Sequence, residues 1–148
     1  MRILVVDDEK RMVESLRDYL ALEGIEAKTA GEGAEAERFL AEEPFDALVT
    51  DLRMPGVDGM SLLRWTREEG PSLPVVMISA HGEVSDAVEA MKLGAYDYLV
   101  KPFDPDELVI RIKKAVGERQ ALNRLEAGRS RYDAGAKLVG ESLAMKEV

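Results

Sequence analysis

Polar residues with chemical potential stand directly after four apolar runs of the sequence. Asp7 and Asp8 follow RILVV, Asp51 follows ALVT, Ser79 follows PVVMI and Lys101 follows YLV. If these runs are parallel strands, their carboxyl ends meet at one edge of a sheet, where such sheets place their chemistry. The spacing therefore predicts that three carboxylates, one hydroxyl and one ammonium group converge there.

Three carboxylates packed together repel one another, which raises the free energy of ionising all of them. A hard divalent cation relieves that repulsion, and Mg²⁺ prefers a few carboxylate, carbonyl and water oxygens. With a metal and an ammonium group to offset charge, an aspartate can attack phosphorus. Asp51 is followed at once by a loop containing Pro55, Gly56 and Gly59, which predicts an exposed and rigidly held carboxylate. We interpret Asp51 as a nucleophile that becomes phosphorylated.

The elements that must position these residues alternate along the chain. Short apolar runs predict strands at 2–7, 46–50, 74–78 and 96–100, and the more polar, alternating residues 25–30 predict an edge strand. Helical spacing and stop signals predict helices at 10–23, 32–43, 59–69, 83–93 and from about residue 105. This alternation predicts an α/β fold, a doubly wound three-layer sandwich around a parallel sheet.

Two of these helices carry further sequence signals, an apolar side in one and an N-terminal cap in the other. In the helix at 83–93, Val84, Val88 and Met91 share one side. In the last helix, Asp104 is the expected N-cap and Pro105 the first helical residue.

Composition bounds the classes of protein that the chain can represent. The chain has 148 residues, 46% of them hydrophobic, no cysteine and a formal net charge of −9. These values are typical of a globular protein and exclude disulfides and thiolate metal sites. The acidic balance argues against a nucleic-acid surface, and no apolar run approaches the roughly 18 residues of a membrane span. We therefore expect a cytoplasmic protein that contacts neither nucleic acid nor membrane.

Four motifs carry a resemblance to a known family. The DD after the first strand, DLRMPGVDG, SAHG and YLVKPF occur in order between residue 1 and about residue 119. This region resembles the receiver domain of two-component response regulators. The resemblance implies a flavodoxin-like, five-stranded sheet of order 2-1-3-4-5. It also implies that Asp51 is the phosphoacceptor and that Asp7, Asp8, Asp51 and the Arg53 backbone carbonyl hold Mg²⁺.

The resemblance assigns roles to further residues as well. Ser79 would be the switch hydroxyl, Tyr98 the switch aromatic residue, and Lys101 the partner of the phosphoryl group. The Lys101–Pro102 peptide bond would be cis, and Pro55 and Gly59 would hold the Arg53 carbonyl in place. The implied partner is a sensor histidine kinase. The chain would be a signalling phosphoacceptor that catalyses its own Mg²⁺-dependent phosphorylation and dephosphorylation, and not an enzyme in the usual sense.

The last predicted helix continues beyond the receiver-like region, which we bound at 1–119. Leu108, Ala115 and Leu122 are spaced by seven residues, which favours an extended helix that pairs two chains, with a frayed linker as the alternative. We expect a homodimer through this helix and the face formed by helix 83–93, strand 96–100 and the last helix. Residues 120–137 form a linker that loses helical periodicity after Gly128 and is predicted to be flexible there.

Residues 138–148 read LVGESLAMKEV, which resembles the opening of the central AAA+ ATPase domain of sigma-54-dependent transcription activators of the NtrC-like family. No Walker A sequence follows, so this chain has no such ATP site. We interpret the chain as a truncated receiver and linker of a longer transcription activator. The alternative is a free-standing receiver with a disordered tail.

Two other functions stay open from the sequence. A phosphohydrolase of the haloacid dehalogenase type also forms an aspartyl intermediate, but it usually needs Asp-x-Asp where this chain has Asp51, Leu52 and Arg53. A receiver-like dimerisation module would never take phosphate. Taken singly, each site residue also has a simpler interpretation as a solvated turn acid, a turn hydroxyl, a surface charge or a core aromatic residue.

Overall fold

The computed structural model describes residues 1–54, 56–80 and 83–139, and their side chains as far as residue 125. Pro55, His81 and almost all of the predicted ATPase opening at 138–148 lie outside the described residues. The chain divides into two compact units, Met1–Val116 and Gly117–Val148. The boundary between the units lies near the predicted receiver boundary at residue 119.

Strands and helices alternate through the described residues. The strands are β1 (Arg2–Val6), β2 (Glu26–Ala30), β3 (Ala47–Asp51), β4 (Val75–Ser79) and β5 (Asp97–Val100). The helices are α1 (Lys10–Leu22), α2 (Gly33–Glu42), α3 (Gly59–Glu68), α4 (Val84–Lys92) and α5 (Pro105–Val139). Every predicted element is present, and most boundaries differ by only a residue or two.

All strand pairs are parallel, and the sheet order is β2-β1-β3-β4-β5. This confirms the doubly wound, flavodoxin-like prediction. In the register, Val6 pairs with Thr50, Asp51 with Ile78, and Ser79 with Val100. The carboxyl ends of the central strands therefore lie at one edge of the sheet.

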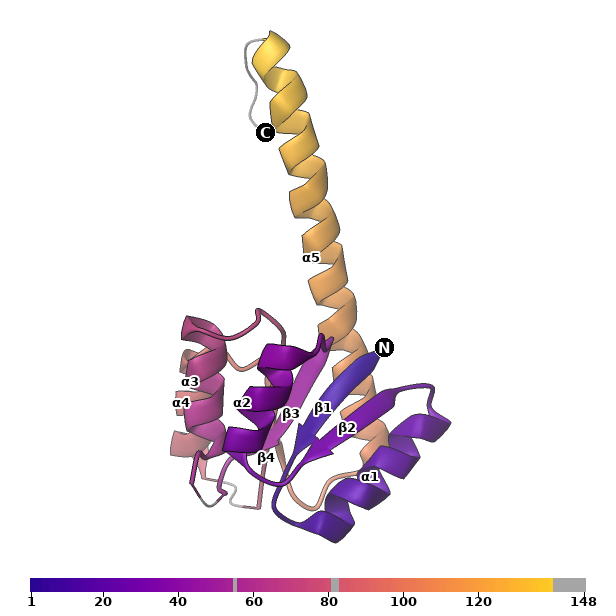
Figure 1. Cartoon of the computed structure of the whole chain (residues 1–148), viewed down its shortest axis with the longest axis vertical. Helices are drawn as coiled ribbons and strands as arrows, with labels where there is room; N and C mark the ends of the chain where they lie inside the picture. Colours follow the sequence, from indigo (N-terminus) through magenta and orange to yellow (C-terminus); the bar gives the residue numbers. More distant parts are fainter. Residues whose placement is uncertain (55, 81–82, 140–148) are drawn as a thin grey trace. The chain divides into compact units, whose positions relative to one another are not determined.

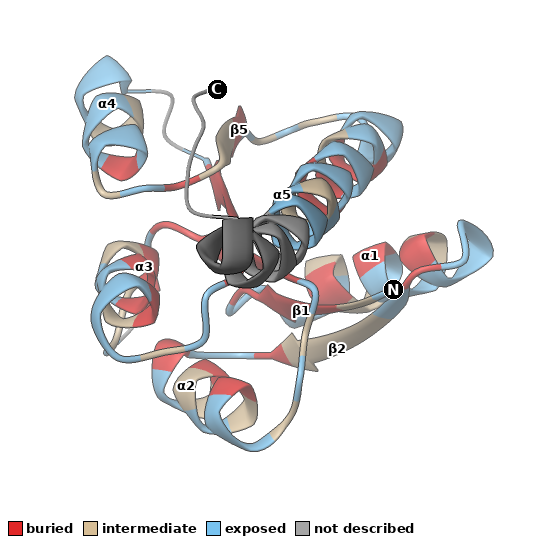
Figure 2. Ribbon diagram, turned by 90° about the horizontal axis from the view of Figure 1, so that it is seen from above, coloured by how far each residue is buried: buried red, intermediate tan, exposed pale blue. Residues whose placement is uncertain are grey.

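Alternate residues of each strand enter two cores on opposite faces of the sheet. From β1, Ile3 and Val5 pack with residues of α1 and the first turns of α5. Leu4 and Val6 pack on the other face with residues of α2, α3 and α4. Figures 1 and 2 show these helices on the two sides of the sheet. Burial on both faces explains the unbroken apolar runs in the sequence.

Helix α4 buries less of itself than its neighbours. Ala90 is its only buried residue, whereas α1, α2 and α3 each bury three or more. The apolar side predicted for this helix, Val84, Val88 and Met91, is exposed. Most of the α4 surface in Figure 2 is accordingly exposed.

Helix α5 begins at Pro105 after Asp104, whose Oδ1 accepts a hydrogen bond from the Asp106 backbone N–H at 2.9 Å. Two of the three predicted heptad residues, Leu108 and Ala115, are fully buried within their own unit and form no pairing seam, whereas Leu122 is exposed. The seven-residue spacing instead reflects packing of one face of α5 onto the sheet, because residues on one helix face also recur at that interval.

Beyond this unit, α5 continues as far as Val139. Residues 129–137 are therefore helical where the sequence predicted a flexible connection. Two alanines, two arginines and a lysine in this stretch are good helix formers, and it contains a single glycine, Gly135. No helix of the described part of the chain is long and apolar enough to cross a membrane.

Candidate functional site

Three carboxylates meet at the carboxyl edge of the sheet, as predicted. One ligand oxygen each from Asp7, Asp8 and Asp51 lies within 4.8 Å of the others. Asp7 follows β1 and Asp51 ends β3, and both are buried, while Asp8 is exposed. The predicted exposure of Asp51 is therefore wrong, because the residue is still part of the doubly covered strand β3. The cluster is therefore anchored on two adjacent central strands and open to solvent on one side.

Lys101 supplies the positive charge of this cluster from the end of β5. Its Nζ donates hydrogen bonds to Asp7 Oδ2 at 2.7 Å and to Glu9 Oε1 at 2.8 Å. The same Nζ lies 3.6 Å from Asp51 Oδ2, which is an ion-pair distance. The ammonium group is thus bonded to two acids and adjacent to the third.

Burial is the main cause of the unusual proton affinities at this site. Burial, with the negative charge of Asp7, raises the pKa of Asp51 to about 6, although Lys101 and the Leu52 N–H act in the opposite direction. Burial also raises the pKa of Asp7 above its usual value despite the hydrogen bond from Lys101. Burial lowers the pKa of Lys101, but hydrogen bonds to Asp7 and Glu9 outweigh it and raise that pKa overall. A second positive charge would stabilise the ionised carboxylates.

The backbone below Asp51 is closely packed. Gly59 N–H donates to the Leu52 carbonyl at 2.9 Å, and a Cβ on Gly59 would lie 2.0 Å from the Asp51 carbonyl oxygen. Only glycine fits this contact, which ties the start of α3 to the end of β3. The buried Thr50 hydroxyl also donates to the Asp51 carbonyl, at 3.0 Å. These contacts fix the position of the Asp51 backbone.

Ser79 and Tyr98 lie on the strands beyond Asp51. Ser79 is buried at the end of β4, and its carbonyl accepts a hydrogen bond from the Lys101 N–H at 2.7 Å. Tyr98 is half-buried on β5 and packs against the core under α3 and α4. The Lys101–Pro102 peptide bond is cis, as the resemblance implied.

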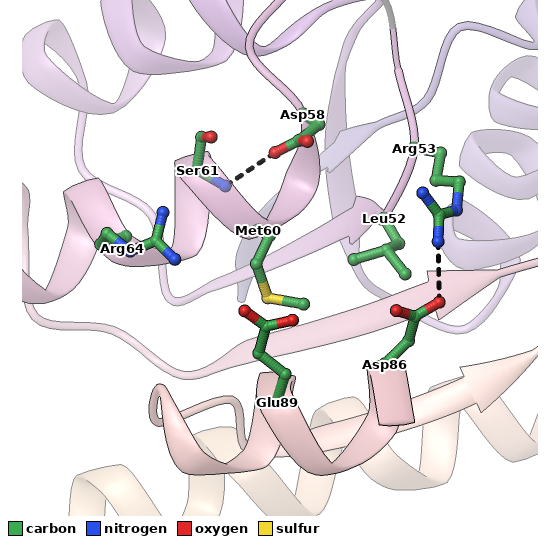
Figure 3. A pocket seen from close by; sticks show the side chains of 8 residues that line it. All are labelled: Leu52, Arg53, Asp58, Met60, Ser61, Arg64, Asp86 and Glu89. Atoms are coloured by element: carbon green, nitrogen blue, oxygen red, sulfur yellow. Dashed lines mark hydrogen bonds and ion pairs between the residues drawn. The ribbon is translucent and has the colours of Figure 1, made fainter. Parts of the chain in front are cut away.

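Arg53 lies in the loop after Asp51 and reaches α4. Its guanidinium donates to Asp86 Oδ2 at 2.9 Å, across a pocket of about 270 Å³ (Figure 3). The pocket is lined by Leu52, Arg53, Asp58, Met60, Ser61, Arg64, Asp86 and Glu89. The side chain of Arg53 is thus engaged with α4.

A larger, mainly apolar groove of about 700 Å³ adjoins the cluster on the side of α1. It is lined by Glu9, Met12, Ser15, Leu16, Tyr19, Ala80, Lys101, Pro102, Phe103 and Pro105. Glu9 and Lys101 line both the groove and the site. The groove therefore opens directly beside the carboxylate cluster.

The oxygen-only donor set fits a hard cation such as Mg²⁺ better than a softer metal, which would favour nitrogen or sulfur ligands. Two of the three acids are held on rigid strand ends, and their mutual repulsion gives a bound cation a clear energetic benefit. The structure thus brings Asp7, Asp8, Asp51 and Lys101 together.

Three contacts of the site were missed by the sequence analysis. Glu9 bonds to Lys101, Thr50 supports the Asp51 carbonyl, and Asp86 pairs with Arg53. The position of Glu9 directly after the paired aspartates, and a polar Thr50 inside an apolar strand, were available signals. Nothing in the sequence marks Asp86, because its contact depends on how α4 approaches the loop.

Comparisons with known proteins agree with this geometry. The family model described as the response regulator receiver domain matches residues 3–113. The C4-dicarboxylate transport transcriptional regulatory protein DctD of Pseudomonas aeruginosa is 34% identical over 99% of this chain. The DNA-binding transcriptional regulator NtrC of Escherichia coli is 37% identical over 99% of the chain. The chain spans about a third of the length of these relatives, 33% and 31% respectively.

Solved structures give the same result. NtrX from Brucella abortus superposes with a TM-score of 0.82 at 34% identity, covering 88% of this chain and 30% of that one. The beryllofluoride-activated NtrC4 receiver domain dimer superposes with a TM-score of 0.75 at 40% identity, covering 79% and 97%.

Proposed function

Because this chain belongs to the family of response regulator receiver domains, we propose that Asp51 accepts a phosphoryl group from a phosphohistidine of a sensor histidine kinase. The observation that carries this proposal is the position of Asp51, at the end of a buried strand, beside two further acids and 3.6 Å from Lys101. In this proposal Asp7, Asp8, Asp51 and the Arg53 carbonyl hold Mg²⁺.

The transfer requires an ionised Asp51 oxygen. With a pKa of about 6, the carboxyl group is mostly deprotonated at neutral pH. An Asp51 oxygen bonds to phosphorus while the bond from phosphorus to the donor imidazole nitrogen breaks, and that nitrogen keeps the electron pair. Bound Mg²⁺ would offset charge on the phosphoryl oxygens. Lys101, already adjacent to Asp51, donates to one of them.

The switch that follows uses the neighbouring strands. Ser79 pairs in register one residue beyond the partner of Asp51, so its hydroxyl is well placed to donate to a phosphoryl oxygen. In the proposal Ser79 moves toward the phosphoryl group and the half-buried Tyr98 turns inward to fill the space. This shifts a two-state equilibrium of the surface formed by α4, β5 and α5.

That surface has the composition of a contact site for a second copy. Large apolar side chains are exposed on it, namely Val84, Val88, Met91, Val100 and Ile110. In the unit from Gly117 onward, Leu122 and Leu125 are also exposed and could pair along the linker helix. Clustered exposed apolar residues commonly mark protein contacts. We propose that phosphorylation acts on a homodimer through these residues.

The groove beside α1 suits the kinase. A donor histidine must reach Asp51, so the surface that carries it must rest beside the carboxylate cluster. The apolar groove lined by Met12, Tyr19 and Phe103 offers such a resting surface directly next to Lys101. We assign this groove to the kinase and the α4 side to the output.

In a full-length protein, the receiver would govern a sigma-54-dependent ATPase that follows the linker. This part of the proposal rests on the relatives, of which the chain spans about a third. The predicted domain limits 1–119, 120–137 and 138–148, and the cytoplasmic location, belong to the same proposal.

Incubation with Mg²⁺ and acetyl phosphate tests the function. Intact mass and oligomeric state are followed for the wild type, for Asp51→Asn, and for Asp18→Asn as a control on an exposed acid of α1. A single phosphoryl adduct in the wild type and the control, absent from Asp51→Asn, supports the proposal. Rapid multiple turnover of the donor would indicate a phosphohydrolase, and no adduct would indicate a scaffold.

A further inference from the structure

Among the described residues, one side-chain ion pair joins the loop after Asp51 to helix α4. Arg53 leaves the loop and its guanidinium binds Asp86 in the first turn of α4, at 2.9 Å (Figure 3). The Asp86 side chain is 16% exposed, whereas that of Arg53 is 57% exposed. Asp86 is therefore largely withdrawn from water, and Arg53 supplies a hydrogen-bond donor to its carboxylate.

The start of α4 has few other attachments among the described residues. Its N-cap, Glu83, makes no side-chain capping hydrogen bond, and Ala90 is its only buried residue. Helix α3 differs on both counts, because Asp58 caps it at Ser61 N–H and four of its residues are buried. The Arg53 contact is thus a substantial part of what holds the first turn of α4.

The same contact restrains the loop. Arg53 is the residue whose backbone carbonyl is assigned to Mg²⁺ under the proposed function, on which this inference rests. A loop that is held before a ligand binds loses less conformational entropy on binding. We propose that Asp86 is a positioning residue for the metal site: by holding the Arg53 side chain, it orders the loop that presents the Arg53 carbonyl and couples Mg²⁺ binding to α4.

Coupling of this kind is reciprocal. If α4 orders the loop for Mg²⁺, then Mg²⁺ must order the first turn of α4 to the same extent. The route is separate from Ser79 and Tyr98, because it runs through the loop of β3 and not through β4 and β5. It links the chemical site directly to the helix that carries Val84 and Val88 on its exposed side.

The test measures the dissociation constant of Mg²⁺ by titration calorimetry on the 148-residue chain, without phosphodonor. Asp86→Asn and Arg53→Ala remove the contact, and both leave the backbone carbonyl in place. We expect each to weaken Mg²⁺ binding about threefold, within the range of exposed ion pairs. The double variant should be no weaker than the single ones, because both remove the same interaction.

Two features separate positioning from a general charge effect. Glu89→Gln removes one negative charge from the same pocket and the same helix. The Glu89 side chain makes no hydrogen bond or ion pair with the described part of the chain, so this variant should leave the Mg²⁺ affinity nearly unchanged. Arg53→Ala removes a positive charge, which by electrostatics alone would tighten cation binding. Weaker binding by this variant is therefore specific to lost positioning.

Hydrogen exchange provides a second readout. In the wild type, Mg²⁺ should slow exchange of the amides in the first turn of α4, and in Asp86→Asn this protection should disappear. Tighter binding by Arg53→Ala, or an equal effect of Glu89→Gln and Asp86→Asn, overturns the inference. A wild type that binds no Mg²⁺ contradicts the proposed function itself, and wild-type binding with unaltered variants contradicts only the role of Asp86.

Discussion

Helices α1 and α4 both follow a strand that ends at the candidate site, but they are held in different ways. Helix α1 lays three apolar side chains into the core, Val13, Leu16 and Leu20. Helix α4 buries only Ala90 and turns its larger apolar side chains outward. The difference shows that the carboxylate cluster lies beside a firmly packed helix, whereas the surface proposed for the output lies on a helix that is packed less firmly.

Energetics explain why this division suits a switch. A buried leucine contributes about 2 kcal/mol or more of burial free energy, which keeps α1 in place. The contacts of one phosphoryl group shift an equilibrium by only a few kcal/mol. Such a shift is comparable with the burial free energy of a helix that buries one residue, Ala90, and is smaller than that of α1.

The largest expected effect compares core substitutions in the two helices. Leu20→Ala should lower the free energy of unfolding by about 3 kcal/mol, because it leaves a cavity under α1. Met91→Ala should change it by less than about 0.5 kcal/mol, because that side chain is already half in solvent. Urea denaturation of both variants measures the difference. Similar losses would show that α4 is packed as firmly as α1.

The next effect concerns the ionisation of Asp51 at the candidate site. The folded pKa of Asp51, about 6, lies above its ordinary value of 3.8. Stability of the metal-free protein should therefore fall as pH rises between these two values, and stay at the lower level above them. Asp51→Asn removes this cost, so at pH 8 the variant should be more stable than the wild type by about 3 kcal/mol.

The matching measurement is thermal or urea denaturation of both proteins in a chelator at several pH values. The advantage of Asp51→Asn should vanish near pH 4, where the wild-type carboxyl group is protonated in the folded protein. If the variant were less stable than the wild type at pH 8, the ionised Asp51 carboxylate would stabilise the folded protein, which contradicts this prediction.

The smallest effect probes how firmly Lys101 is held. Glu9 takes one of its hydrogen bonds, so Glu9→Gln should let the ammonium group approach Asp51 and raise the rate of phosphorylation by acetyl phosphate about threefold. Glu9→Asp keeps the charge but is too short to keep the contact, and should behave like Glu9→Gln. Glu32→Gln, an exposed acid that follows β2, serves as the control. An equal change of the phosphorylation rate in Glu32→Gln would show that overall charge, and not the contact with Lys101, causes the effect.

The sequence was sufficient to predict the parallel sheet and the carboxylate cluster, and the reason is physical. Doubly buried strands must be apolar, so a strand that ends in Asp7 or Asp51 marks its own terminus, and parallel topology brings these termini together. The order of strands and the cis peptide bond came from the resemblance and are present in the structure.

Periodicity was less informative about where an apolar face is directed. The spacing of Leu108 and Ala115 suggested pairing between chains, yet both are buried in their own unit. The spacing of Val84 and Val88 identified a shared side of α4 but not its environment, and both residues are exposed. A repeat identifies a face of a helix, and only the tertiary structure decides what covers it.

Hydrogen exchange of α4 and α1, measured with Mg²⁺ and acetyl phosphate in the wild type and in Asp51→Asn, tests the central claim most directly. We predict that exchange in α4 changes on phosphorylation, that exchange in α1 stays the same, and that neither changes in Asp51→Asn. A wild type that carries a phosphoryl group by intact mass but shows unchanged exchange in α4, or equal changes in both helices, would contradict the account.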